Sequence, residues 1–325
     1  MFQRLVTIFA PALILAGAIL VLYTILLALG INSVSTAFLI VFPLGSGAVI
    51  MKYRPEGRMR GFTRSLLWLI GVMVLATLGA LISGLEGLIC ITMAAVPIFL
   101  GALVGGLIYI LVLRWRAESK GALKIAVLPV ILLGLLAIPP SKPTTYTISN
   151  DIVIDAPAAL VFSMIKSVPD IAPQEVETRL THLLGARKPT AAIWEERPQG
   201  ARRHSHWGDE IHFIENITQI EPDKRIAWDF EFPEGWIADG IEDPHVKVGG
   251  RYFNVLSGEY RLIEANGQTR LTLTTTTYDA SGLGAYAEFW HRYFFTDFHE
   301  VILNVVKHRT EAKARLVTAN LIAAD

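Results

Sequence analysis

The sequence predicts an α-helical transmembrane bundle followed by an α+β domain, in which a curved antiparallel sheet surrounds a long C-terminal helix. The chain has 325 residues, is 52% hydrophobic and has no net charge. Its mean hydropathy of +0.45 is too high for an ordinary soluble protein. The apolar excess lies almost entirely in residues 1–140, whereas polar and apolar residues alternate afterwards. We therefore expect a membrane region over 1–140, a linker at 141–144, an α+β domain over 145–318 and a tail at 319–325.

Five apolar segments are expected to form the membrane region. A helix needs about 17 to 25 residues to cross the hydrocarbon core, and the first four segments have that length. The fifth is shorter, so it spans only if its flanking residues lie in the interfaces, and otherwise it rests in one interface. Gly101-x-x-x-Gly105 allows close approach of a second helix. The segments are 6–29, 33–51, 65–84, 88–113 and 125–138.

Basic residues predict the orientation of these helices. Lys and Arg occur in the loops 52–64 and 114–124 and are absent from the two intervening turns. The positive-inside rule therefore places both basic loops and the N-terminus on the cytoplasmic side of the membrane, which we expect to be a bacterial-type inner or plasma membrane. The α+β domain is extracytoplasmic if the fifth segment spans, and cytoplasmic if it does not.

Composition excludes several classes of function. Lys plus Arg and Asp plus Glu number 29 each, so no strongly basic surface for nucleic acid is expected. Cys90 is the single cysteine, which rules out an internal disulfide and a thiolate metal site. No phosphate loop, dinucleotide fingerprint or nucleophile elbow occurs, so no cofactor is expected. The apolar cores lack Asp, Lys and His, which favours an anchor over a transporter.

The second half of the chain reads as a strand, a short helix, a series of strands and a long helix. The strands are identified by alternation of polar and apolar residues between turns such as EPDK and ANGQ. The helix over about 285–317 has apolar residues spaced by three and four, which predicts a wide buried stripe. A single curved sheet around this helix leaves a cavity between them. The predicted strands are 145–156, 201–207, 210–220, 225–232, 251–265 and 269–280, and the short helix is 157–168.

Four stretches carry a family resemblance: IVIDAPAALVFSMI, then RRHSHWGDEIHFIENITQIEPDKRIAWDF, then GEYRLIEANGQTRLTLTTTTY, and last the helical HRYFFTDFHEVILNVVKHRTE. With them the sequence resembles the START-like or SRPBCC superfamily, which includes polyketide cyclases and lipid-transfer domains. The resemblance covers about residues 145–315 and none of the membrane half. It implies a helix-grip fold with a ligand cavity, and it leaves the ligand open because this superfamily hosts many functions on one scaffold.

Residues 204–212, HSHWGDEIH, contain three histidines. A two-residue turn at 208–209 is expected to join two strands here. That register places His204 and His206 on one face of the sheet and His212 on the other, so the three cannot share one metal ion. No metal-binding residue is therefore predicted.

A ligand pocket is predicted on the sheet face that looks towards the long helix. Its apolar members alternate along their strands, a pattern that an ordinary packed core shows equally well. The two histidines are candidates for hydrogen bonds to a ligand head group, although they fit a purely structural role as well. The candidate ligand-binding residues are His204, His206, Ile211, Phe213, Trp228, Phe230, Leu271, Leu273 and Trp290.

Five polar residues on the long helix, His291, Arg292, Asp297, His299 and Glu300, are interpreted as a solvated face. Charged residues on an amphipathic helix are most commonly exposed to water. No catalytic residue is predicted among them.

Three functions fit the sequence. The leading hypothesis is a membrane-anchored module that binds a hydrophobic small molecule or lipid, with the segment 234–250 as a loop over the cavity entrance. The second is an enzyme similar to the cyclases and dehydrases of the superfamily, with His204 or His206 as general acid or base. The third is a ligand-sensing or protein-interaction module, whose partner the sequence does not identify.

Overall fold

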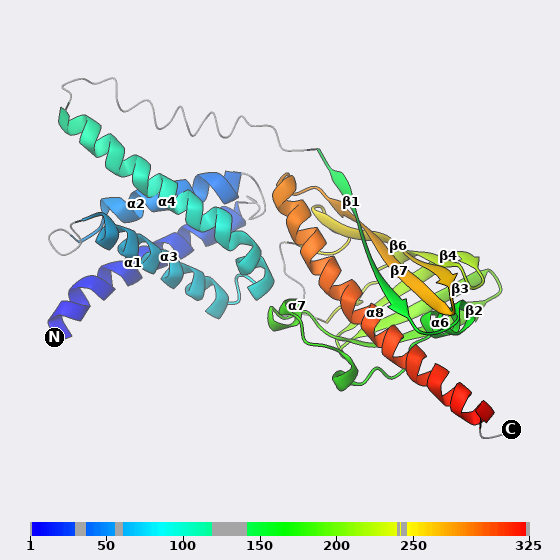
Figure 1. Ribbon diagram of the computed structural model, residues 1–325. Helices are drawn as coiled ribbons and strands as arrows, with labels where there is room; N and C mark the ends of the chain where they lie inside the picture. Colours follow the sequence, from blue (N-terminus) through cyan, green and yellow to red (C-terminus); the bar gives the residue numbers. More distant parts are fainter. Residues whose placement is uncertain are drawn as a thin grey trace. The chain divides into compact units, whose positions relative to one another are not determined.

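The computed structural model describes residues 2–29, 37–55, 61–118, 142–238, 241 and 246–322 (Figure 1). The chain forms two compact units, which divide between residues 141 and 142. The first unit is helical, and the second combines one sheet with helices.

Three described helices of the first unit are long and apolar enough to cross a membrane: Phe9–Ala28, Phe62–Ile82 and Leu88–Leu113. A shorter apolar helix, Leu39–Lys52, occupies most of the second predicted span. The fifth predicted segment, 125–138, lies outside the described residues. The helices are α1 (Phe2–Ala28), η1 (Ala37–Val41), α2 (Phe42–Lys52), α3 (Phe62–Ile82) and α4 (Leu88–Glu118).

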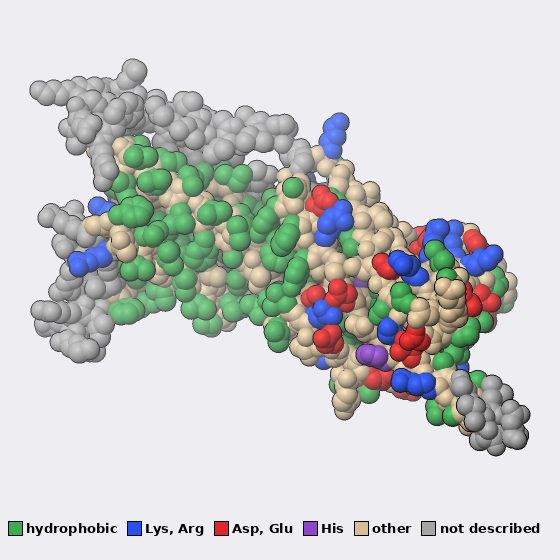
Figure 2. Space-filling model, viewed as in Figure 1, with side chains coloured by type: hydrophobic (Ala, Val, Ile, Leu, Met, Phe, Trp, Pro, Cys, Tyr) green, Lys and Arg blue, Asp and Glu red, His purple; other side chains and the backbone are tan. Residues whose placement is uncertain are grey.

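Glycines let α2 and α4 pack backbone to backbone. A Cβ atom at Gly47 would overlap the carbonyl of Ala102, and one at Gly105 would overlap the carbonyl of Leu44. A Cβ atom at Gly101 would lie 2.8 Å from Pro43. The close approach expected from the glycine spacing therefore occurs. Apolar side chains cover the visible outer surface of this unit, as a lipid-facing bundle requires (Figure 2).

The second unit contains a seven-stranded antiparallel sheet with the order β1-β7-β6-β5-β4-β3-β2. Of these strands, β2 was not predicted from the sequence. The long helix α8 (Ala285–Ile322) packs along β1 and β7 (Figure 1). The strands are β1 (Thr144–Ile154), β2 (Pro189–Arg197), β3 (Gly200–Trp207), β4 (Ile211–Glu221), β5 (Arg225–Glu231), β6 (Phe253–Ala265) and β7 (Gln268–Asp279). The short helices between β1 and β2 are α6 (Ala158–Lys166), η3 (Pro173–Glu175) and α7 (Leu180–Leu183).

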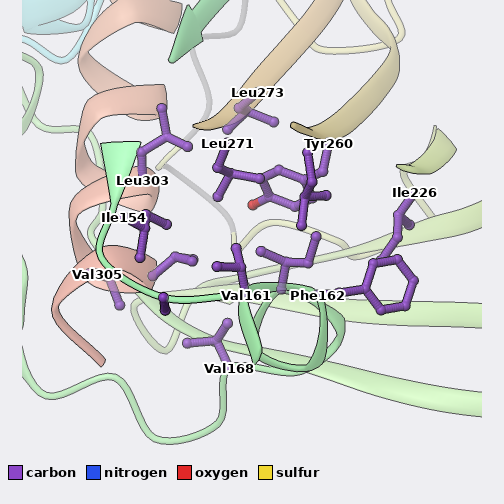
Figure 3. Packing of buried hydrophobic residues seen from close by; sticks show 14 of the residues in the cluster. Ile154, Val161, Phe162, Val168, Ile226, Tyr260, Leu271, Leu273, Leu303 and Val305 are labelled. Atoms are coloured by element: carbon purple, nitrogen blue, oxygen red, sulfur yellow. The ribbon is translucent and has the colours of Figure 1, made fainter. Parts of the chain in front are cut away.

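The two ends of this sheet differ in what covers them. At one end, here called the closed end, α6 packs under the sheet and the turns 222–224 and 266–267 join the strands. Side chains from α6, α8 and the inner face of the sheet meet there (Figure 3). Ile154, Val161 and Leu271 are fully buried in this core. The other end, here called the open end, carries the connections 208–210, 232–252 and 280–284.

Candidate functional site

The strand register in the histidine stretch differs from the one predicted. Trp207 pairs with Ile211 and His206 pairs directly with His212, so the turn contains the three residues 208–210. The expectation of a two-residue turn was therefore wrong. A shift of one residue moves every side chain of one strand to the opposite face, which brings all three histidines to the same face.

Contacts distant in sequence remove Glu210 from the strand. Its carbonyl accepts a hydrogen bond from the backbone N–H of Ala238 at 2.8 Å. Its carboxylate forms an ion pair with Arg187 at 2.9 Å. Gly208 adopts a positive φ of 60° at the first position of the turn, a conformation that glycine tolerates without strain. Together these contacts lengthen the turn by one residue.

The three histidines His204, His206 and His212 form what we call the histidine cluster. Their rings stack on one another and do not point towards a common metal site. His204 Nδ1 lies 3.0 Å from His212 Nε2, and its Nε2 lies 3.0 Å from a carboxylate oxygen of Glu195. The rings of His206 and His212 are parallel, with centroids 4.4 Å apart. Among the described residues, no group of three or more His, Cys, Asp or Glu is placed to hold a metal ion.

Burial lowers the pKa of His206 and of His212, and the neighbouring histidines lower it further. Both rings are therefore held neutral near pH 7. One hydrogen bond, between His204 Nδ1 and His212 Nε2, links two of the rings, and the ring of His206 stacks on that of His212. Protonation of His206 and His212 would place like charges in contact.

The histidine cluster faces away from α8. Arg203 and Ser205, which alternate with the histidines, are buried on the inner face. Trp207, on the same side as these two, contacts Phe298 of α8 edge to face, with ring centroids 5.1 Å apart. The predicted grouping of His204 and His206 with Ile211 and Phe213 was therefore wrong, and the histidines lie on the outer face.

The inner face of the sheet is aromatic at its open end. Phe213 lies 5.7 Å from Phe230, and Phe230 lies 6.1 Å from Phe232, measured between ring centroids. Trp236 packs against Phe232 at 4.8 Å. All of these side chains, like Ile211, are only partly buried. Two of the predicted pocket residues, Phe213 and Phe230, thus lie together on the inner face.

The helix α8 presents a second aromatic row, spaced by four residues. Trp290 lies 5.7 Å from Phe294, and Phe294 lies 6.5 Å from Phe298, between ring centroids. The Trp290 ring is partly buried, yet its Nε1 is buried without a hydrogen-bond partner in the structure. An indole N–H in that state is a free donor for a polar atom.

The other three predicted pocket residues lie deeper. Leu271, Leu273 and Trp228 are fully or almost fully buried in the core of the second unit. The Trp228 ring covers Gly258, where a Cβ atom would overlap it. These residues therefore pack the core between the aromatic open end and α6.

A row of buried polar contacts joins β7 to α8, a feature that was not predicted from the sequence. His299 Nε2 lies 2.7 Å from the Thr275 hydroxyl, and its Nδ1 lies 2.9 Å from the side-chain oxygen of Asn150. His291 Nδ1 lies 2.8 Å from the Thr277 hydroxyl. The expectation that both histidines are solvated was wrong.

Burial explains the chemistry of this row. Desolvation lowers the pKa of His299 to about 4, so its imidazole is neutral at ordinary pH. Both ring nitrogens have partners, which identifies a structural clamp between strand and helix and not an open catalytic base. The signal in the sequence was the alternation of Thr275, Thr277 and Asp279, which places three polar side chains on the inner face of β7.

The remaining polar residues of α8 divide between buried and exposed positions. Asp297 is buried and accepts a hydrogen bond from the Thr181 hydroxyl at 3.1 Å, which ties α7 to α8. Glu300 pairs with Arg179 at 2.6 Å. Arg292 is exposed, as predicted, and pairs with Glu288 at 2.8 Å.

An ion pair between Arg203 and Glu215 is buried on the inner face. The Ser205 hydroxyl donates to Glu215 at 2.9 Å, and Arg203 donates to the carbonyl of Ile165 at 2.7 Å. The guanidinium also lies 4.6 Å from the ring centroid of Trp228. Because each charged group is hydrogen-bonded by protein, the pair is part of the core and not a vacant binding site.

One open pocket of about 220 Å³ lies on a different side, between β1 and α8. It shares no residue with the predicted ligand pocket. Its lining is mostly polar, which does not suit an apolar ligand. The lining residues are Ser149, Asn150, Asp151, Ile152, Glu300, Leu303 and Asn304.

No protein-family model and no curated protein matches this sequence. The chain is similar in structure to Zhui aromatase/cyclase from a Streptomyces species, with 17% identity and a TM-score of 0.36, over 53% of this chain and 96% of that one. It is also similar to the di-domain ARO/CYC BexL, with 16% identity and a TM-score of 0.36, over 64% of this chain and 61% of that one. For Ara h 8.0201 the values are 12% identity and a TM-score of 0.32, over 52% of this chain and 99% of that one. Similarities this weak carry no argument about ligand or activity. The strand order and the long C-terminal helix themselves confirm the predicted fold class, a helix-grip α+β unit after apolar helices.

Proposed function

We propose that this chain is a membrane-anchored module that binds a hydrophobic small molecule or lipid between the inner face of the sheet and α8. The observation that carries the proposal is a difference in burial along that inner face. Leu271 and Ile226 are completely buried. Phe213 and Phe230, on the same inner face, remain partly exposed, as does Trp290 on α8.

Exposed aromatic surface on an inward face is a source of binding energy. An apolar ligand that covers about 250 Å² of it gains about 6 kcal/mol at about 25 cal/mol per Å², before the costs of association. The rings form two rows, one on β4 and β5 and one on α8. We expect a flat or chain-like molecule to contact both.

We expect the indole N–H of Trp290 to donate a hydrogen bond to the ligand. Its Nε1 is buried and has no protein partner, so a carbonyl or hydroxyl oxygen of a ligand would satisfy it. We therefore expect a mainly apolar ligand with at least one hydrogen-bond acceptor. The apolar helices of the first unit would hold the domain beside a bilayer, which is a reservoir of such molecules.

The enzyme hypothesis based on the histidine cluster receives no support from this geometry. His204 and His206 lie on the face opposite α8, where they cannot act on a ligand held between sheet and helix. His299 is on the correct side, but Thr275 and Asn150 occupy both of its ring nitrogens.

The test is mass spectrometry of small molecules extracted from the full-length protein, purified gently from its own membranes. Phe230→Asp should remove the bound molecule, because it places a charge among the aromatic rings. Ile193→Asp is the matched control, since Ile193 is a strand residue that is 38% exposed and lies on the outer face, paired with His204. Equal recovery of one ligand from both variants, or none from the unaltered protein together with no binding of an added fatty acid, would refute the proposal.

A further inference from the structure

The chain enters the second unit at its open end. The first residue of β1, Thr144, pairs with Asp279, the last residue of β7. The same end of the sheet holds the β3–β4 turn, since Trp207 pairs with Ile211. The helix α8 begins there too, at Ala285, directly after β7. The aromatic rows described above therefore lie near the point where the membrane half is attached.

The attachment is short. The sequence predicts that the apolar segment 125–138, which lies outside the described residues, is in lipid, and only residues 139–143 separate it from β1. Five extended residues reach at most about 18 Å. The closed end lies roughly 33 Å further away, because the 11 residues of β1 are separated by ten steps of about 3.3 Å each. The open end is thus the end of the sheet to which the predicted membrane segment is joined.

Exposed apolar side chains are present on the helices next to the open end. On α7, Leu180 is 45% exposed and Leu183 is 68% exposed. On the first turns of α8, Phe289 is 56% exposed and its ring stacks on that of Tyr293, with centroids 6.3 Å apart. Single exposed leucines are common on proteins, so their position is more informative than their number.

The helix α7 is held rigidly in this position. Thr181 binds the buried carboxylate of Asp297 through both its backbone N–H and its hydroxyl, at 3.3 and 3.1 Å. Arg179, just before α7, pairs with Glu300 at 2.6 Å. Both anchors lie on α8. The two leucines are therefore presented on a fixed support, not on a free loop.

We propose that Leu180, Leu183 and Phe289 insert into the interface of the bilayer that holds the apolar helices, so that the open end of the domain faces lipid. This inference rests on the proposed membrane anchoring, but not on the proposed ligand. It gives a hydrophobic molecule a direct path between the bilayer and the aromatic rows. The nearby cations Arg179, Arg187 and Arg292 are all paired with carboxylates. Docking is therefore apolar and does not require anionic lipid.

The closed end supplies a matched control. Leu316 lies near the C-terminal end of α8 and is 65% exposed, almost the same as Leu183. It is also a helical leucine. The two differ in their distance from the attachment to the membrane half, so a label at each position reports location and not residue type.

The test uses the full-length chain in nanodiscs of phosphatidylcholine, with Cys90→Ser to remove the native thiol. Leu183→Cys and Leu316→Cys each carry an environment-sensitive fluorophore, and brominated lipids serve as quenchers. We expect a blue shift and at least twofold quenching at position 183, and neither at position 316. Equal signals at the two positions would overturn the proposal, as would quenching at 183 that appears only with anionic lipid.

A second measurement separates this inference from the proposed function. The double variant Leu180→Ser and Leu183→Ser should slow transfer of a fluorescent fatty acid from vesicles into the protein at least fivefold, with affinity at equilibrium unchanged. If the protein binds no fatty acid, the proposed ligand class is wrong. The fluorescence measurement at position 183 still tests whether this surface inserts into the bilayer. Unchanged transfer in the double variant would count against docking as the entry route.

Discussion

Removal of one partner from the buried ion pair between Arg203 and Glu215 is expected to destabilise the second unit strongly. In Glu215→Ala the guanidinium of Arg203 stays buried, with 3% of its residue surface exposed. The guanidinium keeps its hydrogen bond to the carbonyl of Ile165 and its contact with the ring of Trp228. It loses its only anionic partner among the described residues. The Ser205 hydroxyl loses its acceptor as well.

The magnitude follows from the desolvation of an uncompensated charge. Breaking a buried pair costs about 3 to 5 kcal/mol, whereas replacing both partners by apolar side chains of similar volume is often neutral. We therefore expect Glu215→Ala to lower the free energy of unfolding by about 4 kcal/mol. The double variant Arg203→Met with Glu215→Leu should lose less than about 2 kcal/mol, although the Trp228 ring and the Ile165 carbonyl lose a contact.

The assay is urea unfolding of the full-length protein in mild detergent, followed by tryptophan fluorescence. Arg270→Ala serves as control, because its pair with Asp151 is exposed on both sides and should contribute at most about 1 kcal/mol. If Glu215→Ala costs no more than Arg270→Ala, or if the double variant loses as much stability as Glu215→Ala, the buried charge is not the cause of the loss.

Three further changes test other parts of the structure. Gly258→Ala forces a Cβ atom into the Trp228 ring and should lower the free energy of unfolding by about 1 to 3 kcal/mol, measured as the shift of the urea midpoint. The pKa of His299 is about 4 in the folded protein against 6.5 unfolded, so the unfolded state binds more protons between these values. Stability should therefore be full above pH 6.5 and fall by up to about 3 kcal/mol towards pH 4. His299→Gln should reduce that slope, and unfolding midpoints at pH 4.5 and 7.5 would reveal it. His206→Ala should leave fatty acid affinity within about twofold, because the outer face does not touch the proposed ligand; a tenfold loss in a binding titration would contradict the face assignment.

The fold was predictable because it depends on local patterns. Alternation along residues 269–280 and the three-and-four spacing on α8 each report which side of an element is buried. The strand β2 was missed because its sequence, PTAAIWEER, has two adjacent alanines and ends in charged residues, so its alternation is weak. It became a strand through pairing with β3, from Pro189 with Trp207 to Arg197 with Gly200.

The site was less predictable because contacts between distant residues decide it. The face of His212 depended on whether Glu210 belongs to the strand or the turn, and that was decided by Ala238 and Arg187. Likewise, His291 and His299 of α8 are buried where threonines of β7 lie opposite them. Neither the contacts of Glu210 nor those between β7 and α8 can be predicted from the pattern of about ten neighbouring residues.

The two sides of the inner face differ in a way that bears on ligand entry. On the side of β1 and β7, hydrogen bonds hold α8 in place: His299 to Thr275 and His291 to Thr277, with Lys307 to the carbonyl of Val153 at 2.7 Å. On the side of β3, the contact between Trp207 and Phe298 is made by aromatic rings. Directional hydrogen bonds resist displacement of a helix, whereas apolar ring contacts can be exchanged for equivalent contacts with an apolar ligand. The proposed ligand, entering between α8 and β3 to β5, would therefore replace ring contacts and leave the hydrogen-bonded side intact.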